Sequence, residues 1–113
     1  MFLAHDLVKQ HLRVDGDAED EVIALYVAAA EQSAIAYLNR NVYETQEALN
    51  AAVIGLSAGE APMVINDYIL AAMLLTAGHL HANREDSVVG ASVSALPMGA
   101  RHLLDLSRRR PGV

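Results

Sequence analysis

The sequence contains no cysteine and few aromatic residues. Without thiols, the chain can form neither disulfides nor thiolate metal sites. One phenylalanine and four tyrosines supply all its aromatic bulk. Hydrophobic residues still make up 53% of the 113 residues, and many are alanines, which favour helix but fill little volume. We therefore expect a single domain over residues 1–113, with a thin core that would gain from contact with partners.

The sequence also lacks long apolar runs and an N-terminal targeting pattern. His5 and Asp6 interrupt the opening apolar residues, so we expect no signal segment. The longest apolar stretch, residues 68–78, is far shorter than the ~20 residues that span a bilayer. No membrane partner is expected.

Basic residues are scarce through most of the chain and concentrated at its end. Residues 1–90 hold thirteen acidic and four basic residues, a net charge of −9, whereas residues 91–113 hold one acidic and four basic residues, a net charge of +3. A DNA-binding domain usually has its basic residues along one face. An acidic body with a basic end instead suits self-assembly, in which one subunit's tail meets another subunit's body.

Apolar periodicity predicts an all-α fold, a compact bundle of four to five helices with an extended loop or hairpin arm before the C-terminal helix. We expect a first helix over about residues 3–12 and a second that follows an Asp17 N-cap and ends near residue 38. A short third helix should follow a Thr45 cap, and a fourth should run from Pro62, at its first helical position, to about Asn83. The C-terminal helix should cover about residues 98–109. The second helix has two apolar stripes, which predicts contact on more than one side.

Residues 87–97 interrupt the helical pattern. Valine and alanine alternate there with glycine and serine, which indicates an extended segment. The predicted helical domain offers no internal sheet for this arm to join. It either covers the helices as a loop or pairs outside the subunit, and we favour contact with a partner, because long loops with apolar residues are usually functional.

The sequence offers no convincing catalytic or metal site. His79 and His81 are two residues apart, whereas metal-binding histidines on one helical face are three or four apart, so we expect surface or capping roles. Glu19, Asp20 and Glu21 fit the first turn of a helix better than a catalytic carboxylate pair. No nucleophile elbow or phosphate-binding glycine loop occurs. We expect no enzyme activity, metal or cofactor.

Arg108, Arg109 and Arg110 form the only basic cluster in the sequence. Three interpretations stay open: a solvated helix end, contact with a partner's acidic surface, or weak contact with nucleic-acid phosphates. Arg84 stands beside Glu85 and Asp86, and we expect it to anchor the arm or a neighbour's carboxylate.

Four segments in a fixed order carry a resemblance to a known family. They are residues 7–14 (LVKQHLRV), an alanine-rich helix ending at residues 37–40 (YLNR), residues 80–85 (LHANRE), and residues 96–105 (LPMGARHLLD) followed by arginines. Over residues 7–110 the chain resembles the head–tail connector, or portal-adaptor, proteins of tailed bacteriophages.

The resemblance implies a structural virion protein without catalytic activity. Such proteins form a ring of about a dozen copies beneath the portal. The ring extends the channel for double-stranded DNA, which passes without sequence-specific binding, and a tail-completion or stopper protein docks on it. The implied location is the head–tail interface of the virion, and the host cytoplasm during assembly. The residues that we expect at the subunit or portal interface are Arg84, Val88, Val89, Val93, Leu96, Arg101, Arg108, Arg109 and Arg110.

Two other functions remain open at this point. The helix–turn–helix look of residues 3–40 and the arginine cluster suggest a small helical DNA-binding regulator, although the acidic start of its second helix would meet phosphates. The second alternative is a helical domain that binds a metal or small ligand.

Overall fold

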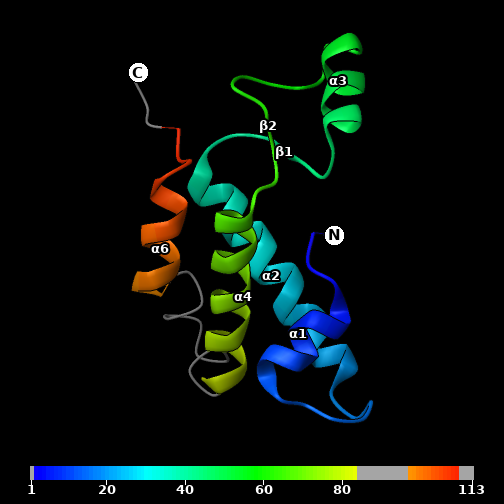
Figure 1. Ribbon diagram of the computed structural model, residues 1–113, viewed down its shortest axis with the longest axis vertical. Helices are drawn as coiled ribbons and strands as arrows, with labels where there is room; N and C mark the ends of the chain where they lie inside the picture. The colour runs from blue at the N-terminus through cyan, green and yellow to red at the C-terminus, as the bar shows by residue number, and fades with distance from the viewer. Residues whose placement is uncertain (1, 84–96, 110–113) are drawn as a thin grey trace.

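The computed structural model describes residues 2–83 and 97–109, and it confirms the all-α fold class. The described helices are α1 His5–Leu12, α2 Asp20–Leu38, α3 Gln46–Ile54, α4 Asp67–Ala82 and α6 Met98–Asp105 (Figure 1). Two short strands, β1 Val42–Tyr43 and β2 Met63–Val64, flank α3.

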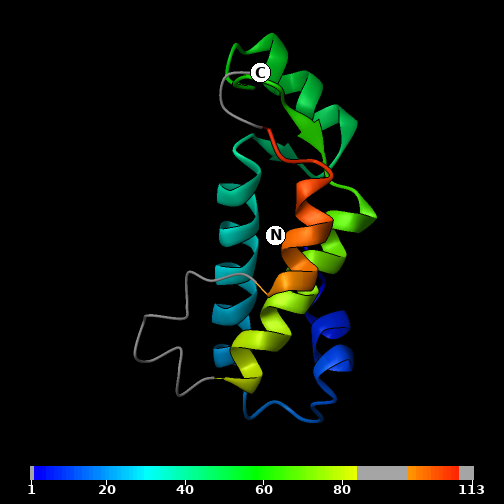
Figure 2. The ribbon, with the colours of Figure 1, turned by 90° about the vertical axis from the view of Figure 1, so that its left-hand side faces the viewer.

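The helices α1, α2, α4 and α6 form the bundle, in which α4 packs against the other three (Figures 1 and 2). Its core is aliphatic. The largest fully buried side chains are Leu3, Ile23, Leu38, Ile69, Met73, Leu104, Val8 and Val27. In contrast, α3 makes its main contacts with the two strands and stands beyond one end of the bundle.

The two apolar stripes predicted on α2 have different environments. One stripe is fully buried in the bundle and consists of Ile23, Val27, Ala30, Ala34 and Leu38. The other faces outward, with Val22 and Leu25 exposed. By length and hydropathy alone this 19-residue helix could cross a bilayer, but core helices of globular proteins pass the same test. Its outward stripe leaves apolar surface for another molecule.

The N-terminal segment and α1 are both attached to α2 by charged groups. Glu31 on α2 is buried, and its Oε2 accepts the backbone N–H groups of Phe2 at 2.7 Å and of Leu3 at 2.8 Å. In the first turn of α2, Asp20 Oδ1 lies 3.0 Å from Lys9 Nζ and 3.3 Å from His5 Nε2. The hydrogen bond from Lys9, aided by His5, lowers the pKa of Asp20, and the pKa of Lys9 is raised in turn.

The predicted N-cap of α2 is wrong. The helix begins at Asp20 rather than after Asp17, and Glu19 occupies the cap position without a side-chain capping bond. Gly16 adopts a positive φ of 81°, which glycine allows at no steric cost, so the expected turn is present. Asp17 instead lies 3.5 Å from Lys9. Tertiary attraction to α1 therefore replaces capping as the role of these acids.

The predicted start of α4 at Pro62 is also wrong, and so is the absence of an internal sheet. Residues after Pro62 are extended, because the N–H groups of Met63 and Ile65 donate to the carbonyls of Asn41 and Tyr43, at 3.0 and 2.8 Å. The strands β1 and β2 thereby pair in parallel. The helix begins at Asp67, where the Asn66 side chain accepts the N–H of Ile69 at 2.9 Å.

Two further boundaries follow the sequence more closely. Thr45 caps α3 as predicted, accepting the N–H of Ala48 at 3.1 Å. The C-terminal helix starts at Met98 as predicted but ends at Asp105, four residues early, because residues 107–109 turn back toward α2. In the predicted arm, residues 87–96 lie outside the described residues, and Pro97 occupies the N-cap of α6.

Candidate assembly surfaces

The segment after α6 closes the C-terminal end of α2. The backbone N–H of Arg109 donates to the carbonyl of Leu38 at 2.9 Å, and the side-chain amide of Asn39 donates to the carbonyl of Arg109 at 3.4 Å. Leu38 is the last residue of α2, whose final carbonyls have no partner within the helix. Residues 107–109 are therefore held in a defined place by backbone chemistry.

Tyr37, in the last turn of α2, lies close to three charged side chains. The guanidinium carbon of Arg108 lies 4.4 Å from the centre of the Tyr37 ring, and its Nε donates to the Tyr37 carbonyl at 3.0 Å. Arg101 of α6 lies 6.0 Å from the same ring centre. The Tyr37 hydroxyl donates to the carboxylate of Asp105. Such exposed cation–π contacts contribute only about 0.5–1 kcal/mol, so this cluster mainly positions the arginines.

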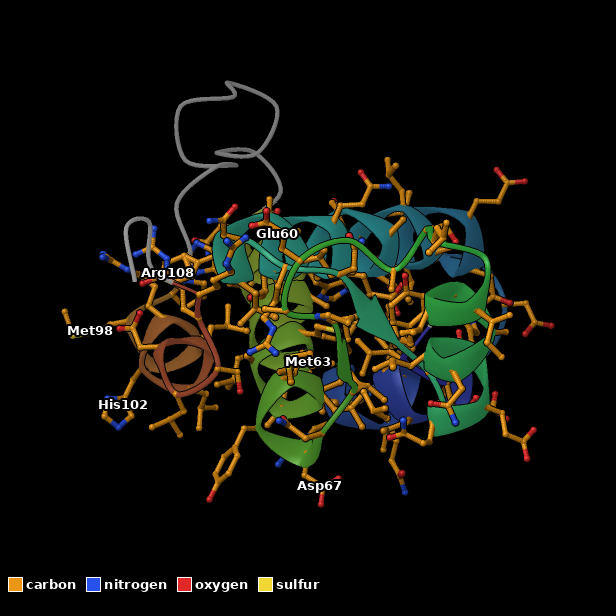
Figure 3. The ribbon with its side chains drawn as sticks, turned by 90° about the horizontal axis from the view of Figure 1, so that it is seen from above. Glu60, Met63, Asp67, Met98, His102 and Arg108 are labelled. Carbon is orange, nitrogen blue, oxygen red and sulfur yellow. The ribbon has the colours of Figure 1, made fainter. Side chains whose placement is uncertain are left out.

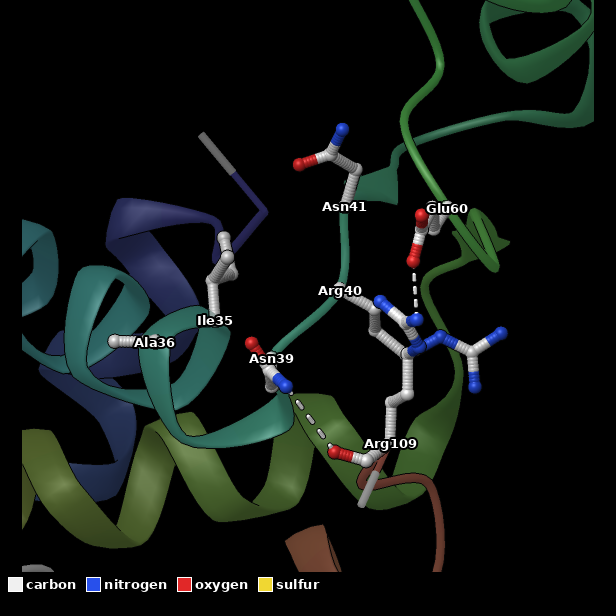
Figure 4. A pocket seen from close by; sticks show the side chains of 7 residues that line it. All are labelled: Ile35, Ala36, Asn39, Arg40, Asn41, Glu60 and Arg109. Carbon is white, nitrogen blue, oxygen red and sulfur yellow. Dashed lines mark hydrogen bonds and ion pairs between the residues drawn. The ribbon is translucent and has the colours of Figure 1, made fainter. Parts of the chain in front are cut away.

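A shallow pocket of about 380 Å³ lies beside this segment, between the end of α2 and the residues that precede β2 (Figure 4). Arg109 forms an ion pair with Glu60 across it. Arg40 Nε donates to the Ala61 carbonyl at 2.7 Å, and its Nη1 to the Ser107 carbonyl at 3.2 Å. The pocket walls are thus joined by arginines that already have protein partners.

The outward side of α6 combines apolar and cationic groups. Met98, His102 and Leu106 are spaced by four residues, which places them on one helical face. Met98 is 86% exposed and Leu106 61% exposed, and Figure 3 shows Met98 and His102 pointing away from the body of the molecule. Arg101 is also exposed beside them. We call these four residues the α6 outer face.

A second surface, apolar and acidic, lies beyond one end of the bundle. Residues 42–64, which we call the α3 lobe, contain three glutamates and no lysine or arginine. Ile54 is 83% exposed and Leu56 94% exposed. An open groove of about 390 Å³ lies between Val53, Leu56, Ala58, Gly59 and Pro62. The two surfaces are therefore unlike in charge but alike in having exposed apolar side chains.

The sequence model of the phage gp6-like head–tail connector proteins matches residues 6–108. The match runs from α1 to the segment that closes α2. The chain belongs to this family. No curated protein and no solved structure matched the chain.

Membership confirms the resemblance seen in the sequence and gives this connector a structural role in a phage particle. Connector proteins are not a known class of enzyme. The family implies interaction with portal and tail components, and location in the virion.

The predicted interface residues of the connector fall into two groups. The structure brings Arg101, Arg108 and Arg109 together around the end of α2. Arg84, Val88, Val89, Val93, Leu96 and Arg110 lie outside the described residues. Because Arg108 and Arg109 contact Tyr37 and Glu60 of their own chain, they do not form the free basic face that a DNA-binding regulator needs.

The histidine pair of the connector serves structural contacts. His81 Nε2 lies 3.6 Å from Glu19, and its ring meets the Tyr26 ring edge-on. The ring Nδ1 of His79 lies 3.4 Å from the side-chain Nδ2 of Asn83 at the end of α4. Among the described residues, no group of three or more histidine and acidic side chains could hold a metal ion.

Three residues of these surfaces escaped the sequence analysis. Tyr37 was part of a family motif, but nothing local showed that arginines about seventy residues later would meet it. Ile54 and Leu56 belong to residue types that are usually buried, so residue type alone did not mark them as surface residues. The signal that could have found them is the sequence Ile54-Gly55-Leu56, in which a helix ends at glycine and a large apolar residue follows.

Proposed function

We propose that this connector forms a head-to-tail ring that docks on the portal, extends the DNA channel and receives the tail. The observation that carries this proposal is the pair of unlike outward surfaces, the α3 lobe and the α6 outer face, at different sides of one fold. A ring requires one patch to meet a different patch on the next subunit. We also propose that residues 1–113 form a single domain. Assembly of the ring would take place in the host cytoplasm.

The charge of the connector favours a channel through which DNA slides. The formal net charge is −6, and a negative wall repels phosphates rather than holding them. Double-stranded DNA would pass without sequence-specific binding. A mobility-shift experiment with random duplex at low salt should show no tight complex, and tight binding would contradict this part of the proposal.

The main test mixes the purified connector with the portal protein of the same phage. Sedimentation and electron microscopy should show closed rings of connector seated on the portal. Arg101→Glu should weaken this assembly, because it reverses a charge at the α6 outer face. Arg13→Glu makes the same charge change at an exposed site after α1 and serves as the control. A connector that stays monomeric and ignores the portal would refute the proposal.

The arm residues Val88, Val89, Val93 and Leu96, with Arg84 and Arg110, remain proposed contacts. Deleting residues 88–95 should preserve the helical content, because the described helices lie within residues 5–82 and 98–105, and should weaken assembly. Circular dichroism and sedimentation measure the two effects separately. If the deletion unfolds the monomer, the segment covers the core and is no assembly arm.

A further inference from the structure

The helix α3 has less support from its own chain than any other described helix. It is nine residues long and makes its main contacts with β1 and β2, and within the described structure none of its side chains is buried. Helices this short are marginal in water unless packing stabilises them. The Thr45 cap supplies part of the support. Packing by another molecule would supply the rest.

Leu56, just beyond α3, is placed at a cost to the backbone. The N–H of Ser57 donates to the Ala52 carbonyl at 2.8 Å, and the N–H of Leu56 to the Val53 carbonyl at 3.1 Å. This pair of bonds is the Schellman termination, whose left-handed position glycine usually fills. Leu56 fills it with φ 59° while its side chain stays in solvent. A strained, exposed leucine points to a role outside the monomer.

The surface that Leu56 and Ile54 create is apolar with a negative border. Glu47 on α3 is exposed, and the chain has no lysine or arginine from residue 41 to residue 83. A fitting partner therefore offers apolar side chains with cationic groups beside them.

The α6 outer face has this composition. It presents Met98 and Leu106 as exposed apolar groups, with Arg101 and His102 alongside. In Figure 1, α6 lies along one side of the bundle and α3 stands beyond one end, toward the other side, and in Figure 3 the two helices are again apart. One molecule cannot bring its own two surfaces together in this fold, but two copies can.

We propose that the α3 lobe of one copy docks on the α6 outer face of the next. Ile54 and Leu56 pack against Met98 and Leu106, and Glu47 meets Arg101 and His102. The contact is heterologous, so repetition produces a ring or an open chain. This inference rests on the proposed function, because it names the surfaces through which the subunits of that ring join.

The absence of cysteine makes a direct test available. We would introduce Ile54→Cys and Met98→Cys, alone and together, and oxidise the proteins under conditions that allow assembly. A disulfide forms only when the two Cα atoms approach within about 7 Å, and a short bismaleimide linker extends this reach. A mixture of the two single variants should give a covalent dimer, and the double variant a ladder of larger covalent species.

The matched control pairs Met98→Cys with Leu25→Cys, an exposed leucine on the outward stripe of α2. This pair should give no ladder. The inference is overturned if the Leu25 pair cross-links and the Ile54 pair does not, because α2 is then the surface that meets α6. It is also overturned if wild-type protein assembles and neither pair cross-links. If wild-type protein does not assemble even with portal, the proposed function itself fails.

A second variant separates assembly from folding. Leu56→Gly places the preferred residue in the left-handed position, so the monomer should melt at the same or a higher temperature. Loss of the leucine side chain should weaken self-association by roughly tenfold. The double variant Ile54→Asp with Leu56→Asp should weaken it by roughly 100-fold or more. Unchanged association in both would overturn the inference.

Discussion

Replacement of Glu31 by alanine should destabilise the connector chain through the loss of one buried carboxylate. Glu31 is only 8% exposed, and a single oxygen accepts two backbone N–H groups, from Phe2 and Leu3. Leu3 is itself fully buried. The carboxylate therefore fixes the path by which the N-terminal segment enters the core.

The magnitude follows from two ways in which the variant can respond. If the segment stays in place, two N–H groups lose a charged acceptor, at about 1.5–3 kcal/mol each. If the segment detaches, water satisfies these groups but the burial of Leu3 is lost, at about 1.5–3 kcal/mol. The chain adopts the less costly response, so Glu31→Ala should reduce the free energy of unfolding by about 2–3 kcal/mol.

Urea unfolding followed by far-ultraviolet circular dichroism measures this loss, and it suits a chain without tryptophan. Gln32→Ala, at an exposed neighbouring position, is the control and should change stability by less than about 0.5 kcal/mol. Leu3→Ala in the Glu31→Ala background should cost almost nothing more if the segment has detached. Equal stability of Glu31→Ala and Gln32→Ala would refute the reasoning.

Three other perturbations test separate contacts. Tyr37→Leu removes the aromatic ring under Arg108 and the hydroxyl, so trypsin should cleave after Arg108 faster than in wild type. Tyr37→Phe keeps the ring and should show a smaller increase in cleavage rate. Equal cleavage rates in all three proteins would contradict the contact. Because Lys9 lowers the pKa of Asp20, their ion pair stabilises the fold at pH values above the ordinary pKa of aspartate, and this stabilisation is lost as the pH falls through the lowered pKa. Asp20→Asn should therefore make the loss of stability with falling pH less steep. An unchanged dependence of stability on acid pH would count against the ion pair. Asn66→Ala should destabilise the fold by about 1 kcal/mol in urea, because α4 loses its N-cap, and no loss would show that the cap bond is unimportant.

The sequence was sufficient for elements whose cause is local. Apolar periodicity predicted the bodies of α2 and α4, since the stripe that a helix buries recurs every three or four residues. The N-cap of α3 was also predictable, because the residue type of Thr45 is one that caps helices. The prediction from Pro62 was wrong because it used only the local fit of proline to a first helical position. The residues after Pro62 are extended because they form hydrogen bonds with the carbonyls of Asn41 and Tyr43, about twenty residues earlier. Pairing over that distance leaves little trace in a local pattern.

The candidate surfaces show the same division. Charge drew attention to Arg108 and Arg109, and the family resemblance to Arg101, but their contacts lie on α2 and before β2, and only the folded chain shows them. Leu56 gives the opposite case: its type predicts burial, and its left-handed backbone and exposure appear only in three dimensions. Surface roles of apolar residues are therefore the part that sequence reasoning misses most easily.

The attachments of α2 also have a mechanical consequence. Residues 2–3 hang from Glu31 in its middle, α1 is held to its first turn by Asp20, and Arg109 is bonded to its last residue. A force on either outer segment of the described chain is therefore transmitted to α2. Because Arg109 pairs with Glu60 and Arg40 donates to the Ala61 carbonyl, the same force also reaches the α3 lobe.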